Sequence, residues 1–171
     1  MAASAKPLRL LFLCTGNSAR SQMAEAILNH KAGGRIRAES AGSRPAPRVN
    51  PLATETLARY GIQWAGRPPR STEGLDREPW NLVITVCDKA KESCPIFPGQ
   101  PVLAHWGMPD PAEVHGEDAA RRAFQDTFVL LTRRIDLLLA LPMESLTRLA
   151  LEARVRAIGA TPTLYPATPS A

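Results

Sequence analysis

The chain has 171 residues, of which 44% are hydrophobic, and it carries a formal net charge of +5 with a pI of about 9.6. This length suits one domain with a substantial core. The longest apolar runs are far shorter than the roughly 20 residues of a membrane span, and residues 1–7 lack a leader pattern, so we expect a soluble, cytoplasmic protein. The arginines are scattered without a basic block, which favours small anions over nucleic acid or a membrane as ligands.

Short apolar runs alternate with helical patterns along the first two thirds of the chain. Strands are predicted at residues 8–13, 36–41, 81–86 and 102–105. Helices are predicted at residues 18–31 and 51–60; Asn50 and Pro51 are typical of a helix start and Gly61 of a helix end. This alternation predicts an α/β fold with a parallel sheet flanked by helices, in which ligands bind at the carboxyl ends of the strands.

A long helix is predicted from Glu117, where apolar residues recur every three or four positions. Pro142 interrupts this pattern, and a second helix is predicted over residues 142–158. Its apolar residues fall on two faces, so it either covers the core or joins two copies of the chain. Residues 1–7 and 159–171 are predicted to be flexible ends.

The loop CTGNSAR joins the first predicted strand to the first helix, and it is the strongest candidate for a binding site. Free N–H groups and the positive end of the helix dipole favour an anion at such a position. Gly16, Ser18 and Ala19 are small enough to let the backbone wrap around a tetrahedral oxyanion, and Arg20 can clamp it with two hydrogen bonds. The same field is expected to lower the pKa of Cys14 and make it a thiolate nucleophile.

Polar side chains fill the rest of this loop. Thr15, Asn17, Ser18 and Ser21 offer hydrogen bonds that hold either the loop or the sulfur, and the sequence does not assign these bonds. The alternative interpretation is a buried structural cysteine beside a solvent-facing arginine.

Three cysteines in such a chain argue against a static disulfide framework and favour catalytic, redox or metal chemistry. Cys87 follows a predicted strand as Cys14 does, and Cys94 comes seven residues later. The alternatives are a buried cysteine at a strand end and a free loop thiol. A zinc site is disfavoured because the chain has no CxxC pair, and His105 is expected to pack beside Trp106 instead of binding metal.

The segment CTGNSARSQMAEA, placed after the first strand, resembles the active-site loop of the low-molecular-weight protein tyrosine phosphatase fold. The remaining matches, AESAG, NLVITVC, the Cys87 and Cys94 pair and CPIFPGQPVLAHWGMPDPA, are most similar to the arsenate reductases built on that fold. The resemblance covers about residues 8–140. It implies a four-stranded parallel sheet in a catalytic domain at residues 8–141, and the additional C-terminal helix at residues 142–158 extends beyond it.

The resemblance also implies a reaction. Cys14 would attack arsenate while Asp110 assists the loss of an oxygen, Cys87 would form a disulfide with Cys14 and release arsenite, and Cys94 would take over the disulfide for reduction by thioredoxin. Residues seven apart on a helix are about 10.5 Å apart along its axis, too far for a disulfide. The segment DKAKESC is therefore expected to unwind on oxidation.

Two further implications concern the cofactor and the alternative reaction. No tightly bound cofactor is expected; a candidate potassium site comprises Asn17, Glu25 and Ser40, although GRPPRST lacks the acidic ligand that the resemblance leads one to expect there. The alternative is a phosphatase of the same fold, but Pro111 and Ala112 stand where its tyrosine-specific members carry aromatic residues. A third alternative is a non-enzymatic redox or metal sensor.

Overall fold

The computed structural model describes residues 6–64, 67–92 and 94–161. Its strands are β1 Leu8–Cys14, β2 Ile36–Gly42, β3 Leu82–Thr85 and β4 Val102–His105. They form one sheet in the order β2-β1-β3-β4, and every pair is parallel. The predicted four-stranded parallel sheet is therefore confirmed.

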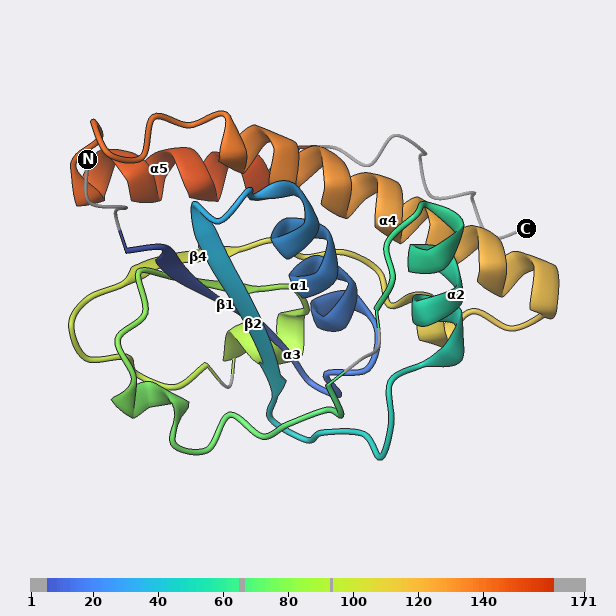
Figure 1. Cartoon of the computed structure of the whole chain (residues 1–171). Coiled ribbons are helices and arrows are strands. Elements are labelled where there is room, and N and C mark those ends of the chain that lie inside the picture. The colour runs from blue at the N-terminus through green and yellow to red at the C-terminus, as the bar shows by residue number, and fades with distance from the viewer. Residues whose placement is uncertain (1–5, 65–66, 93, 162–171) are drawn as a thin grey trace.

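Helices cover this sheet and connect its strands (Figure 1). They are α1 Arg20–Lys31, α2 Pro51–Arg59, α3 Asp88–Glu92, α4 Glu117–Leu139 and α5 Arg148–Gly159, with short 3-10 turns at Leu75–Arg77 and Pro111–Glu113. The predicted start of α2 is confirmed, since the Asn50 side chain accepts a hydrogen bond from the Leu52 N–H at 2.9 Å and Pro51 follows it.

The core lies between the sheet and the helices packed on it. The central strand β1 is flanked by β2 and β3, and its residues from Leu10 to Leu13 are buried because both faces are covered. Helix α1 packs against β1 and β2 and also contacts α2 and α4. The register places Cys14 beside Gly42, and Thr85 beside His105, at the carboxyl edge of the sheet. Residues far apart in sequence thus meet at the edge where ligands were expected.

The C-terminal helix begins later than the sequence predicts. The chain turns after Leu139, and α5 starts only at Arg148, where the Thr147 side chain accepts a hydrogen bond from the Ala150 N–H at 3.2 Å. Leu151, Val155 and Ile158 are buried, whereas Leu149 is 72% exposed. The helix therefore covers the core of its own chain, the first of the two roles expected for it.

Helix α5 also protects the edge strand β4. The Leu103 N–H donates to Glu152 at 3.2 Å, and Arg156 Nε donates to the Leu103 carbonyl at 3.0 Å, so side chains occupy backbone groups that would otherwise pair with another strand. Gly159 belongs to α5 and lies against the His105 carbonyl, so the expected tail does not begin there. Residues 1–5 and 162–171, expected to be flexible, lie outside the described residues. In the part of the chain that the structure describes, no helix is long and apolar enough to cross a membrane.

Candidate active site

The loop from Cys14 to Arg20 is held in shape by a second backbone segment, residues 43–50. The carbonyl groups of Cys14, Thr15, Gly16 and Ser18 accept hydrogen bonds at 2.8 to 3.3 Å from the N–H groups of Ser43, Arg44, Ala46 and Asn50. Helix α1 has no side-chain cap at Ala19, so its first N–H groups are left without a capping side chain among the described residues. Because the loop carbonyls are hydrogen-bonded to residues 43–50, their negative ends point away from the loop centre. The N–H groups at the helix start can then bind an oxyanion.

Gly42 makes this close packing between the two segments feasible. A Cβ atom at this position would lie 2.4 Å from the Thr15 carbonyl oxygen and 3.0 Å from the Asn17 nitrogen. Both neighbours are backbone atoms of the oxyanion loop, which cannot rotate away as a side chain would. Only glycine at the end of β2 therefore fits, a requirement that sequence reasoning missed although AESAG carries the residue.

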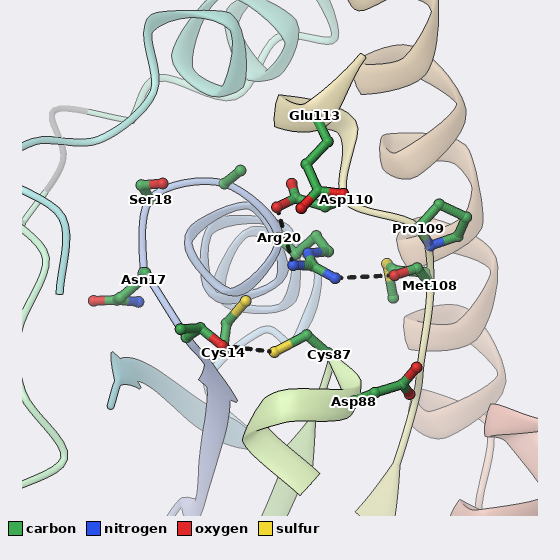
Figure 2. A pocket seen from close by; sticks show the side chains of 13 residues that line it. Cys14, Asn17, Ser18, Arg20, Cys87, Asp88, Met108, Pro109, Asp110 and Glu113 are labelled. Carbon is green, nitrogen blue, oxygen red and sulfur yellow. Dashed lines mark hydrogen bonds and ion pairs between the residues drawn. The ribbon is translucent and has the colours of Figure 1, made fainter. Parts of the chain in front are cut away.

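Arg20 joins the loop to the candidate acid on the opposite side of the site. Its Nη1 donates to the Met108 carbonyl at 3.0 Å, and its Nη2 lies 3.3 Å from Asp110 Oδ2 (Figure 2). Its Nε is buried and has no hydrogen-bond partner among the described residues. Since buried donors are normally satisfied, this atom is suited to an incoming oxyanion.

A cavity of about 430 Å³ opens over the loop. The loop residues form its floor, and its remaining lining residues are Cys87, Asp88, Met108, Pro109, Asp110 and Glu113. The structure thus brings Cys14, Arg20, Cys87 and Asp110 together, as predicted. Cys94 lies elsewhere, half-buried and not among the residues that line this cavity.

The two thiols at the cavity interact with each other, and this changes the pKa expected for Cys14. A hydrogen bond from Cys14, with further bonds from Thr15 and the Ala90 N–H, lowers the pKa of Cys87 to about 5. The same bond and burial raise the pKa of Cys14, against the effect of Arg20. The expectation that Cys14 itself carries the lowered pKa is wrong for the free protein, because the sequence did not show that Cys87 lies against it.

Thr15 and α3 hold Cys87 in this position. The Thr15 Oγ1 lies 3.3 Å from the Cys87 sulfur, and the Ala90 N–H donates to that sulfur at 3.4 Å. Asp88, the next residue, lies 2.9 Å from His105 Nε2, and the other ring nitrogen of His105 lies 2.7 Å from Thr85 Oγ1. His105 therefore fastens the start of α3 to the sheet, a role that the expectation of simple packing beside Trp106 missed.

Comparison with known proteins assigns this arrangement to a family. The model of the family described as low molecular weight phosphotyrosine protein phosphatase matches residues 9–150. The chain belongs to this family. The arsenate reductase of Bacillus subtilis (strain 168) is 36% identical over 118 residues, which cover 67% of this chain and 82% of that protein. The chain's relatives within the family thus include the arsenate reductases that it resembles in sequence.

Solved structures of this phosphatase family share the fold. The thioredoxin-dependent arsenate reductase of Corynebacterium glutamicum matches with a TM-score of 0.58 and 28% identity; the match covers 75% of this chain and 60% of that one. A low molecular weight protein tyrosine phosphatase from T. tengcongensis matches with a TM-score of 0.65 and 26% identity, covering 75% of this chain and 95% of that one. The fold alone therefore does not separate reductases from phosphatases.

The Asn17 side chain stabilises the shape of the oxyanion loop. Asn17 is fully buried with a positive φ of 50°, and its amide donates to Ser21 at 2.8 Å and to Ser40 at 2.9 Å. Its oxygen accepts from the Arg70 N–H at 3.0 Å. Asn17, Ser21 and Ser40 therefore form a buried hydrogen-bond network that braces the loop, and Figure 2 shows the Asn17 side chain pointing away from Arg20 and Cys87.

Of the expected potassium ligands, Asn17 and Ser40 are in contact, and the oxygens of all three residues already have partners in the structure. The Asn17 oxygen accepts a hydrogen bond from the Arg70 N–H, and the Ser40 hydroxyl accepts one from the Asn17 amide. Glu25 forms an ion pair with Arg67. Arg67 belongs to GRPPRST, the segment in which an acidic ligand was expected. Nor do any three His, Cys, Asp or Glu side chains gather into a metal site elsewhere in the described ranges.

Proposed function

We propose that the chain reduces arsenate to arsenite by a relay of Cys14, Cys87 and Cys94. The observation that carries this proposal is the contact between the oxyanion loop and a second thiol, with Cys87 Sγ 3.3 Å from Thr15 Oγ1 in the cavity that also holds Cys14. Hydrolysis of a phosphate ester needs one thiol, whereas reduction needs a second one to take up the oxidation. The reductases among the relatives support this proposal.

Arsenate binds first, as a tetrahedral oxyanion in the loop of residues 14–20. The N–H groups at the start of α1 and the Arg20 Nε, which has no partner in the described part of the chain, donate to its oxygens. Cys14 passes its proton to its hydrogen-bond partner Cys87 as its sulfur attacks arsenic. Asp110 donates a proton to one arsenate oxygen, which leaves as water, so that a sulfur–arsenic bond replaces an oxygen–arsenic bond.

Reduction occurs in the next step. Cys87 releases its proton to water and attacks the Cys14 sulfur, which forms a Cys14 to Cys87 disulfide. The electron pair of the sulfur–arsenic bond stays on arsenic, so As(V) becomes As(III) and leaves as arsenite. Two thiols have lost two electrons, and arsenic has gained them.

Cys94 then attacks Cys87, which frees Cys14 and moves the disulfide to Cys87 and Cys94. Helix α3 separates these two residues, so we expect it to unwind in the oxidised form. Burial raises the pKa of Cys94, and such opening would relieve that effect. A dithiol protein of the thioredoxin type restores the reduced state by thiol exchange.

The alternative is hydrolysis of a phosphomonoester by Cys14, Arg20 and Asp110, with the other cysteines incidental. No aromatic side chain is among the described residues that line the cavity, so a tyrosyl ring would find no stacking partner there. The acidic side chains of Asp88 and Glu113 at the cavity would further oppose large anionic substrates.

The experiment that separates these reactions is peptide mapping after anaerobic exposure of the reduced protein to arsenate, with phosphate as a control. We expect a Cys87 to Cys94 disulfide with arsenate alone. The C94S variant should stop at Cys14 to Cys87, and C87S should produce no arsenite. Three free cysteines, with Cys14 protected from alkylation, would instead support the phosphatase.

A further inference from the structure

Behind the oxyanion loop, the side chains of three glutamates and three arginines form one network of ion pairs. Its members are Glu25, Glu39, Glu78, Arg9, Arg67 and Arg70. Glu39 alone meets three arginines, at 2.7 Å from Arg9, 3.2 Å from Arg70 and 3.7 Å from Arg67. Carboxylates and guanidinium groups balance, so the network has no surplus negative charge for a cation.

Within this network, Arg67 forms an ion pair with Glu25, the most deeply buried carboxylate of the three. Glu25 is only 1% exposed, and its carboxylate pairs with the Arg67 Nη2. An unpaired carboxylate at such a depth would be strongly destabilising. The Arg67 side chain is 42% exposed and reaches Glu25 from a solvent-connected cavity of about 670 Å³ that both residues line.

The same segment reaches the oxyanion loop through its backbone. Gln22 donates to the Arg67 carbonyl at 3.2 Å and to the Asn17 oxygen at 3.4 Å, and the Arg70 N–H donates to that oxygen at 3.0 Å. Asn17 in turn is the loop residue with a positive φ. The position of Arg67 over Glu25 is therefore linked, through Gln22 and Asn17, to the shape of the oxyanion loop.

We propose that the Arg67 guanidinium takes the place of a bound monovalent cation behind the oxyanion loop, so that the protein neither binds nor requires potassium. Arg67 is a positioning residue, since it contacts Glu25 and is linked to the loop through Gln22 and Asn17. Its removal leaves the buried Glu25 carboxylate without its positive partner, at a cavity through which ions can enter. Replacing Arg67 by a small neutral residue should therefore create a potassium site.

The test compares thermal unfolding of the full chain in potassium, sodium and tetramethylammonium chloride at equal concentration. The wild-type midpoint should be the same in all three salts. R67A should be less stable in tetramethylammonium and should regain stability with potassium, by about 3–6 °C at ten times the dissociation constant of the ion. Because Arg67 is linked to the oxyanion loop, R67A should also raise the KM for arsenate, and potassium should lower it again. R67K should behave as wild type.

Two further variants separate a cation site from a general salt effect. R121A removes another arginine that pairs with two glutamates, Glu55 and Glu117, far from this network in sequence, and its midpoint should not respond to potassium. In R67A E25Q the potassium response should vanish, because the carboxylate is gone. A potassium-specific stabilisation of the wild type, or an R67A protein that responds equally to all three salts, would overturn the proposal. If R67A does not fold, R67M provides the same comparison.

Discussion

Gly42→Ala should damage the oxyanion loop without removing any side chain that contacts substrate. The added Cβ would lie 2.4 Å from the Thr15 carbonyl oxygen, whereas an ordinary contact is about 3.5 Å, so the loop must retreat by about 1 Å. Overpacking of this kind costs about 1–3 kcal/mol of unfolding free energy. A displacement of about 1 Å at a reacting group lowers activity about 100-fold. We expect both effects, the larger one on kcat/KM for arsenate.

The assay measures kcat/KM for arsenate and the free energy of unfolding for wild type, G42A and S43A. Ser43 is the next residue, its side chain is exposed, and its N–H still donates to the Cys14 carbonyl in S43A, so this control should match wild type. An arsenate kcat/KM of G42A within twofold of wild type would refute the claim that the loop has no room to move.

Three further predictions concern the thiols and α5. The alkylation rate of Cys87, followed by mass spectrometry, should fall only below a pH of about 5, because the thiolate is the nucleophile, whereas Cys94 should react only at higher pH. T15V should raise the pH midpoint of Cys87, because a hydrogen bond to its thiolate is lost; an unchanged midpoint would contradict that bond. V155A should lower the free energy of unfolding by about 1–3 kcal/mol in denaturant titration, whereas L149A should change it by less than about 0.5 kcal/mol.

Much of the fold could be predicted because local sequence signals and burial agree. The run at β1 is apolar on both faces because the strand is central, and Asn50 with Pro51 starts α2 as such a pair usually does. The start of α5 was predicted six residues early, since Pro142 suits a first helical position as well as a turn. Thr147, a residue type common at helix starts, was the signal that could have corrected it.

The individual residues of the candidate site could be predicted from the sequence, but the interactions between residues distant along the chain could not. Cys14 and Arg20 are joined by one strand-to-helix loop, so local sequence was enough to pair them. The hydrogen bond that moves the lowered pKa from Cys14 to Cys87 joins residues distant along the chain. The pairing of Arg67 with Glu25 is equally distant, and the sequence showed only that GRPPRST lacks an acid.

The sequence by itself determined the chemistry that the chain carries: a cysteine and an arginine around a helix start, two further thiols and an acid before a proline. Hydrogen-bonding capacity, apolar periodicity and turn preferences are properties of neighbouring residues, and these set the strands, the helices and the loop. Only the tertiary structure decided which thiol holds the charge, why Gly42 must be glycine and which cation faces Glu25. Each of these depends on distances of a few ångströms between segments that the folded sheet brings together, and contact energies and pKa values change steeply over such distances.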